Sequence, residues 1–219
     1  KLSSADFSNK SFRWLTAKDI EIEGCSVNAM RVNYVGELGW ELHHPIKHQN
    51  QIFDALFEVG EEFGLKPFGI RAMDSMRIEK SYRMVGTELS IEYSAFESGM
   101  DRFICLDKDN FIGREELIEW QERGSENQLV TLEIDGVEEA DALGNNALTS
   151  AGELIGRATG GGFGFRVNRS LALAMVKPQY ANEGTEFSID ILGKDHIARV
   201  IQDSPFDSQN RRLRDVIDN

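Results

Sequence analysis

Cysteine is scarce in this sequence. The 219 residues include only Cys25 and Cys105, and neither has a second cysteine or a histidine at the spacing of a zinc site. A reduced, intracellular setting is the simplest interpretation, and we expect a cytoplasmic location. The sequence leaves a single disulfide between the two cysteines open.

Metal ligands, long apolar runs and basic charge are also in short supply. The four histidines predict no metal set: His43 and His44 are neighbours on an expected strand and point to opposite faces, while His48 and His196 are isolated. No apolar run approaches the ~20 residues of a membrane span. The net charge of −13 repels phosphate backbones and anionic membrane surfaces, so we expect no nucleic acid and no membrane as partner.

The start of the chain lacks both a methionine and the apolar stretch of a secretion signal, since Lys1 to Arg13 are polar. We therefore expect the chain to be a piece of a longer protein. Its composition, 41% hydrophobic and 28% charged, is that of a soluble globular protein. The length allows one large or two small domains.

The most informative segment that is present runs from Tyr34 to Glu41, with the sequence Tyr-Val-Gly-Glu-Leu-Gly-Trp-Glu. A strand is expected over residues 27–35, a tight turn at the glycines, and a second strand leaving through Trp40. Glu41 would then lie near a hairpin tip beside two aromatic rings. Such a carboxylate can accept two parallel N–H bonds from a planar heterocycle such as a pterin or guanine. An ordinary hairpin, with its aromatics in the core and Glu41 in water, is the alternative.

Hydrophobic periodicity predicts the other elements. Helices are expected over residues 48–63, 69–81 and 113–123. After residue 124 the pattern changes to short alternating runs between turn residues, which predict a small barrel or sandwich. These runs cover residues 130–134, 153–158, 171–176, 187–192 and 197–201. A domain boundary is therefore expected near residues 124–128.

The run Gly160-Gly-Gly-Phe-Gly164 suggests a phosphate-binding loop, but no Lys-Ser/Thr pair follows it as a P-loop requires. We interpret it as a flexible loop between barrel strands. Arg157, Arg166 and Arg169 flank it and would meet an anionic ligand or form weak surface pairs.

The segment from Gly69 to Arg83 is richly charged. One interpretation is a solvated helix face on which Glu79 and Arg83 form an i,i+4 pair. The other is an anion site, because Arg71 lies one turn from Ser75 near the start of the helix, where the dipole favours negative charge.

No Ser/His/Asp or Cys/His pair with a meaningful spacing is present. Asp74 and Asp101 are the best carboxylate candidates for a general base. Residues of this kind are more often helix caps or surface groups.

Three segments, in order, resemble the signatures of the aminomethyltransferase (glycine cleavage T-protein) superfamily. Tyr34 to Glu41 is similar to Tyr-x-Gly-Glu-x-Gly-x-Glu, and Gly69 to Arg83 to the helix Gly-x-x-Ala-x-Asp-Ser-x-Arg-x-Glu. Phe111 to Leu117 is similar to Phe-Ile-Gly-(Arg/Lys)-x-x-Leu, and segments after residue 155 match the family's barrel. Within the superfamily, the likeness is strongest to the folate-binding portion of sarcosine and dimethylglycine dehydrogenases.

The resemblance implies an α+β fold. Residues 1–124 would be the second part of the folate-binding domain, a ferredoxin-like layer, and residues 125–219 a small antiparallel C-terminal β-barrel. The implied function is one-carbon transfer to tetrahydrofolate, from a methylated amine that has been oxidised.

The resemblance also implies the folate-binding residues. Glu41 would bind the pterin amine and ring N–H, and Tyr34 would contact folate nearby. Trp40 and Arg71 are further folate-binding candidates. Met73 stands where T-proteins carry an arginine that is used on folate, and Arg71 lies two residues earlier.

The family's catalytic aspartate lies in the first half of the folate domain, so we expect no catalytic residue here and an isolated chain that is inactive. FAD is expected only in a preceding domain. The alternatives are a T-protein, a sulfonium-compound demethylase, or a non-catalytic folate-binding protein. Asn33 and Glu37 argue against the last, because that group carries Cys and Gln at these positions. The donor amine and the oligomeric state stay open.

Overall fold

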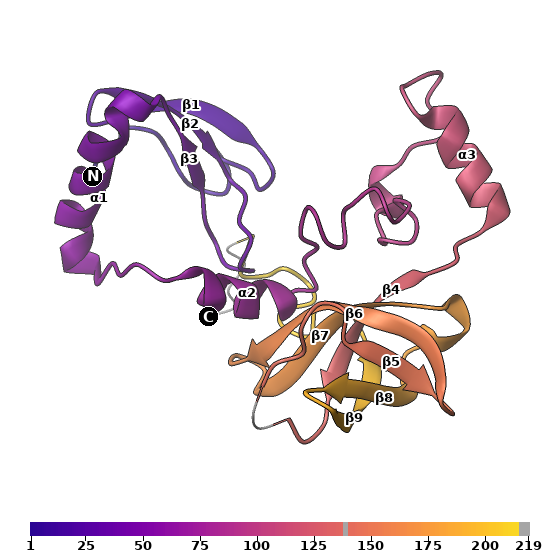
Figure 1. Cartoon of the computed structure of the whole chain (residues 1–219). Coiled ribbons are helices and arrows are strands. Elements are labelled where there is room, and N and C mark those ends of the chain that lie inside the picture. Colours follow the sequence, from indigo (N-terminus) through magenta and orange to yellow (C-terminus); the bar gives the residue numbers. More distant parts are fainter. Residues whose placement is uncertain (138–139, 215–219) are drawn as a thin grey trace. The chain divides into compact units, whose positions relative to one another are not determined.

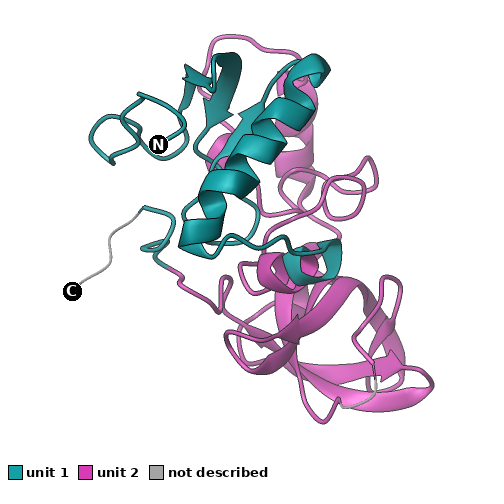
Figure 2. Cartoon of the chain, turned by 90° about the vertical axis from the view of Figure 1, so that its left-hand side faces the viewer, with its two compact units in different colours: residues 1–73, 209–219 teal, residues 74–208 magenta. Residues whose placement is uncertain are grey.

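A computed structural model describes residues 1–137 and 140–214 of the chain (Figure 1). Its contacts divide the chain into unit 1, Lys1–Met73 with Gln209–Asn219, and unit 2, Asp74–Ser208 (Figure 2). The units meet in the sequence between Met73 and Asp74 and between Ser208 and Gln209, not at the boundary expected near residues 124–128. The domains 1–124 and 125–219 therefore stay a prediction.

Unit 1 contains a three-stranded antiparallel sheet in the order β1-β2-β3, from strands β1 (Ala17–Ile22), β2 (Cys25–Met30) and β3 (Glu41–His43). Ile22 pairs with Cys25 across the turn Glu23-Gly24, in which both residues have positive φ, 47° and 73°. Two such residues match the twist of the flanking strands, which is the geometry that two-residue hairpins favour.

The core of unit 1 lies between this sheet and helix α1 (Gln49–Gly60), which Figure 1 draws beside the strands. Alternate residues of β1 and β2 are buried, as the period of a half-buried strand requires. The helix adds Ile52 and continues into the 3-10 turn η2 (Glu61–Phe63) before Gly64 ends it with φ 69°. The helix expected over residues 48–63 is thus present. The buried cluster comprises Phe12, Ile20, Ile22, Cys25, Val27, Ala29 and Ile52.

The connection between β2 and β3 is wider than the tight glycine turn that the sequence predicts. Met30 pairs with Glu41, so residues 31–40 form a loop and the strand expected over 27–35 ends at Met30. Asn33 organises the loop, because its side-chain oxygen accepts the N–H groups of Val35 and Gly36 at 3.1 and 2.8 Å. An asparagine that binds its own backbone two residues on offers the chain an alternative to strand pairing.

Helix α2 (Ile70–Ile78) and helix α3 (Arg114–Arg123) correspond to the two other expected helices. Short 3-10 turns complete the helical segments, and they are η1 (Ile46–His48), η3 (Asp101–Phe103) and η4 (Pro178–Tyr180).

The second half of the chain forms a closed antiparallel barrel in the strand order β4-β7-β6-β5-β8-β9. Its strands are β4 (Gln128–Ile134), β5 (Ala147–Ser150), β6 (Glu153–Gly164), β7 (Arg169–Val176), β8 (Glu186–Ile191) and β9 (Lys194–Ile201). Aliphatic residues from all six strands form one buried cluster inside it. The expected α+β fold with a small antiparallel C-terminal barrel is confirmed.

The interpretation of Gly160 to Gly164 as a flexible loop is wrong, because these residues form the end of β6 and pair with β7. The glycines are needed for close approach. A Cβ at Gly161 would lie 2.7 Å from the carbonyl oxygen of Ala142, and one at Gly164 would lie 2.9 Å from Cγ of Glu79. Glycine in a strand often marks such a site, where another backbone or side chain comes close.

Candidate functional site

Glu41 is the first residue of β3 and has an exposed side chain. Its Oε2 lies 3.1 Å from Nε2 of His43, which is on the same face of the strand two residues later. Among the described residues its Oε1 has no hydrogen-bond partner. The carboxylate can therefore accept N–H groups of a ligand without first breaking a buried contact.

Trp40 lies next to Glu41 in sequence but belongs to the interior of unit 1. Its ring packs edge-on against Phe7, with centroids 5.3 Å apart, and near Phe12 at 6.1 Å. It also packs against the buried cluster, as Leu42 does, so Trp40 and Leu42 face inward while Glu41 faces out. The structure thus separates the indole from the carboxylate, and a direct folate contact for Trp40 stays a prediction.

Arg31 is the first residue of the loop over residues 31–40 and is almost completely buried, with 1% of its surface exposed. Its guanidinium donates to the carbonyl oxygens of Phe12 and Leu213 and lies 5.6 Å from the centroid of the Trp40 ring. These contacts fix the start of the loop that carries Tyr34, which is partly buried. Alternation places Arg31 on the same face as Val27 and Ala29, which was the available signal of its burial. Its charge favours exposure, so it was not predicted as a buried residue.

Arg71 lies exposed in the first turn of α2. Ser75, one turn later, does not share an anion site with it in this structure, because its hydroxyl donates to the carbonyl oxygen of Phe163 at 2.6 Å. Asp74 forms an ion pair with Arg77 at 3.1 Å, and Asp101 begins the exposed turn η3. Asp74 is paired with a cation and Asp101 is exposed, so neither has the buried environment that tunes a carboxylate to act as a general base.

The charges that follow α2 are not a solvated face, and the expected Glu79–Arg83 pair is wrong. Glu79, with 1% of its side chain exposed, pairs instead with Arg166, while Arg83 pairs with Asp203 at 3.3 Å. Lys80 is also buried and donates to the carbonyl oxygens of Phe206 and Asp207. A signal was available in the sequence, because charges at three of four consecutive positions, 77, 79 and 80, cannot all lie on one helix face.

A second buried ion pair lies beside the first. Glu88 is completely buried and accepts the N–H of Met84 at 2.8 Å and the hydroxyl of Thr159. Nη1 of Arg77 lies 3.8 Å from Oε2 of Glu88. Buried charges persist when they are paired and hydrogen-bonded in this way, so these residues hold unit 2 together.

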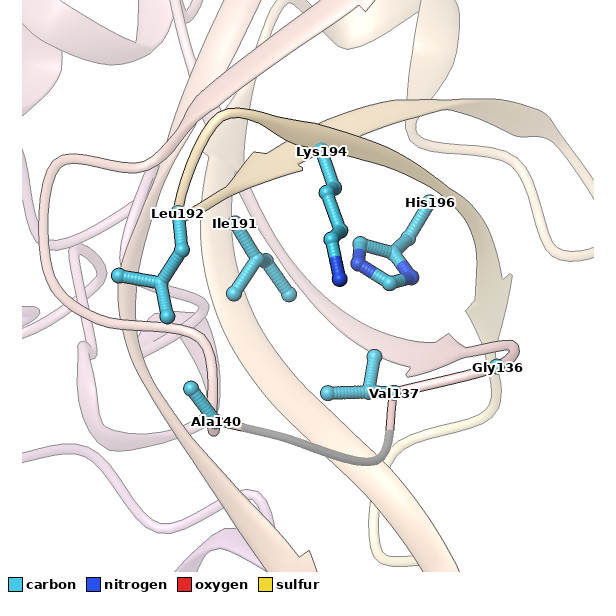
Figure 3. A pocket seen from close by; sticks show the side chains of 7 residues that line it. All are labelled: Gly136, Val137, Ala140, Ile191, Leu192, Lys194 and His196. Atoms are coloured by element: carbon cyan, nitrogen blue, oxygen red, sulfur yellow. The ribbon is translucent and has the colours of Figure 1, made fainter.

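Two further features have no assigned role. A small hollow of about 160 Å³ lies at one end of the barrel, where Figure 3 shows Lys194 and His196 above Val137. Cys25 and Cys105 are both free thiols, Cys25 buried and Cys105 exposed. Across residues 1–137 and 140–214, no group of three or more His, Cys, Asp or Glu could hold a metal ion.

No helix in the described part of the chain is both long and apolar enough to cross a membrane.

Two family models match the chain in sequence order. Residues 1–108 match the GCVT N-terminal domain, and residues 127–207 match the glycine cleavage T-protein C-terminal barrel domain. A crystal structure of glycine cleavage system aminomethyltransferase T from Bartonella henselae superposes with a TM-score of 0.75. It is 24% identical and covers 84% of this chain and 50% of its own, so this likeness shows the fold.

Curated relatives fall into two groups. Mitochondrial dimethylglycine dehydrogenase of Homo sapiens is 33% identical over 93% of this chain and 23% of its own length. Mitochondrial sarcosine dehydrogenase of Mus musculus is 32% identical over 97% of this chain and 24% of its own. Aminomethyltransferase of Desulfitobacterium hafniense is 34% identical over 92% of this chain and 54% of its own.

The chain thus spans about a quarter of the dehydrogenases and about half of the aminomethyltransferase. Because one domain model matches its first half, the next matches its barrel, and the fold agrees, the chain belongs to the aminomethyltransferase (glycine cleavage T-protein) superfamily.

Proposed function

We propose that this chain is the folate-binding segment of a methylglycine dehydrogenase-like or aminomethyltransferase-like enzyme, in which a one-carbon unit is transferred to tetrahydrofolate. The observation that carries the proposal is Glu41, an exposed carboxylate at the start of a sheet strand, whose Oε1 has no hydrogen-bond partner within the described part of the chain. The relatives named dimethylglycine dehydrogenase, sarcosine dehydrogenase and aminomethyltransferase support it.

Each residue has a separate task in this proposal. Glu41 accepts the pterin amine and ring N–H, Tyr34 contacts folate nearby, and Arg71 supplies a positive charge for an anionic part of the ligand. Tetrahydrofolate, when bound, supplies the nitrogen that receives the one-carbon unit. Arg31 and the bonds of Asn33 hold the loop, so that Glu41 meets the ligand without a large ordering cost.

Binding of 5-formyl-tetrahydrofolate to the full-length protein, measured by calorimetry, tests this proposal. Glu41→Ala removes charge-assisted bonds worth about 1.5–3 kcal/mol each, so we expect the Kd to rise at least about tenfold. Glu21→Ala is the matched control, because Glu21 is another exposed glutamate of the same sheet. Equal affinity of wild type and Glu41→Ala would contradict the proposal.

The isolated 219-residue chain should bind more weakly than the full-length protein and should not turn over, because we expect no catalytic residue in it. Formation of methylene-tetrahydrofolate from formaldehyde and tetrahydrofolate measures this. A rate above the uncatalysed rate would show that the chain carries catalytic machinery of its own.

The methylated amine substrate, the FAD domain and the cytoplasmic location belong to the whole protein and stay predictions. The absence of nucleic acid and membrane partners likewise rests on the net charge of −13.

A further inference from the structure

Helix α2 is too short to be stable by itself. It runs only from Ile70 to Ile78, and isolated helices shorter than about 12–15 residues are marginal in water. Its first residues, Ile70, Arg71 and Ala72, are exposed and gain little from packing. The contacts that keep the helix formed must therefore come from its other end.

Arg166, on the β6–β7 hairpin, supplies one such contact. Its Nη2 donates to the carbonyl oxygen of Met76 at 2.9 Å, and that carbonyl belongs to the last turn of α2. A cation that bonds the last carbonyls satisfies groups the helix leaves open and interacts favourably with its dipole.

Glu79 holds Arg166 in this position. The Arg166 guanidinium donates through Nε to Oε2 of Glu79, and the backbone N–H groups of Arg166 and Val167 donate to Oε1 at 2.7 and 3.3 Å. The guanidinium also lies 3.8 Å from the centroid of the Phe206 ring. A planar fork that stacks and donates in two directions is a task for arginine that lysine performs poorly.

Strand β6 also contacts the second half of α2 and the residue that follows it. Ser75 donates to the carbonyl oxygen of Phe163. A Cβ on Gly162 would lie 3.6 Å from Cδ1 of Ile78, and one on Gly164 would lie 2.9 Å from Cγ of Glu79. The contact at Gly162 is ordinary, whereas Gly164 leaves the space that the side chain of Glu79, directly after α2, needs next to the strand.

We propose that Arg166 is a positioning residue, which caps the C-terminal end of α2 and thereby keeps its exposed first turn helical, so that Arg71 is held ready for an anionic part of the folate. This inference rests on the proposed function, in which Arg71 contacts folate. It adds a residue from the barrel hairpin that touches no ligand.

Hydrogen exchange in the full-length protein tests the first step. The N–H groups of Ala72 and Met73 both bond the carbonyl oxygen of Gly69 and report the first turn of α2. In Arg166→Lys we expect them to exchange about tenfold faster, which corresponds to about 1.4 kcal/mol. Arg166→Lys is the main variant, because Arg166→Ala leaves the Glu79 carboxylate buried without a counter-charge and endangers folding.

Arg169→Ala is the matched control. Arg169 lies three residues away, is 48% exposed and forms a surface pair with Glu133 at 3.1 Å. Such pairs contribute little, so exchange at Ala72 and Met73 should match the wild type. Unchanged exchange in Arg166→Lys as well would overturn the inference.

Folate affinity tests the second step through a double-mutant cycle. We expect Arg166→Lys to raise the Kd for 5-formyl-tetrahydrofolate about tenfold in the wild-type background and less than about twofold when Arg71 is already alanine. Additive effects, or an unchanged Kd despite faster exchange, would make Arg166 merely structural. If the wild type does not bind 5-formyl-tetrahydrofolate, the proposed function fails instead, whatever the exchange data show.

Discussion

At the scale of single residues, unit 2 depends on carboxylates that accept several N–H groups. Glu97 is buried, with 8% of its surface exposed. It accepts the backbone N–H of Ser94 at 2.8 Å and those of Glu126 and Asn127 at 3.1 and 2.8 Å. Burial raises the pKa of Glu97, but these hydrogen bonds outweigh it and hold that pKa below its ordinary value of 4.5.

Replacement of Glu97 by Gln should therefore destabilise the chain. Loss of the charge weakens three hydrogen bonds, and we expect the free energy of unfolding to fall by about 1–3 kcal/mol at pH 7. Because the folded pKa is depressed, the contribution of Glu97 is present above the unfolded pKa and lost as the pH falls through the folded one. Urea unfolding of wild type and Glu97→Gln at several pH values measures this.

The two unfolding curves should thus converge below about pH 4.5. Glu92→Gln, at an exposed glutamate of the same segment, is the control and should leave the midpoint unchanged. A stability difference that stays constant from pH 7 to pH 3 would rule out the charge of Glu97 as its cause.

At the scale of elements, strand β6 shows how glycine serves close packing in this fold. Gly156 lies opposite Val176 of β7, and a Cβ there would lie 2.2 Å from the carbonyl oxygen of Met175. Neither backbone can yield without breaking the ladder, so the strand pair tolerates only glycine at this position. Gly162, farther along the same strand, has ordinary room for a methyl group.

Gly156→Ala should lower the free energy of unfolding by about 2–4 kcal/mol, because overpacking distorts the β6–β7 ladder. Gly162→Ala, in the same strand, should change it by less than about 1 kcal/mol. Chemical denaturation of both variants compares them directly. Equal stability of the two would show that the contact with Met175 relaxes at no cost.

At the scale of the whole molecule, acidic charge dominates. The 37 Asp and Glu residues exceed the 24 Lys and Arg, and the pI is about 4.8. Such a charge keeps a protein dispersed at neutral pH through repulsion between molecules. It also repels anionic ligands at long range, so the folate that we propose as ligand would need local positive groups such as Arg71.

The 219-residue chain should be least soluble near pH 4.8, where this repulsion vanishes. Turbidity measured across a pH series tests the prediction, and added salt should narrow the difference between pH 4.8 and pH 7 because it screens the charges. Full solubility at the pI would mean that exposed polar surface, and not net charge, keeps the molecules apart.

The sequence determined most helices and strands of this protein, but not which of them pack against each other. Periodicity located the helices and five of the six described barrel strands but missed β5 (Ala147–Ser150). The order of motifs identified the superfamily. Both are properties of residues close together in the chain. The outward position of Glu41 also follows from local alternation. The loop over residues 31–40 was missed, because it depends on where Met30 finds its partner.

Only the tertiary structure decided which charges are buried. Glu79 meets Arg166 from 87 residues away, and Gly164 of β6 leaves the space that the Glu79 side chain occupies. Local pattern cannot show this, since a charged residue is exposed or buried according to what distant chain lies over it. The predicted folate-binding surface is thus local in origin, while the support of its helix α2 comes from the barrel, because a nine-residue helix lacks the length to hold its own shape.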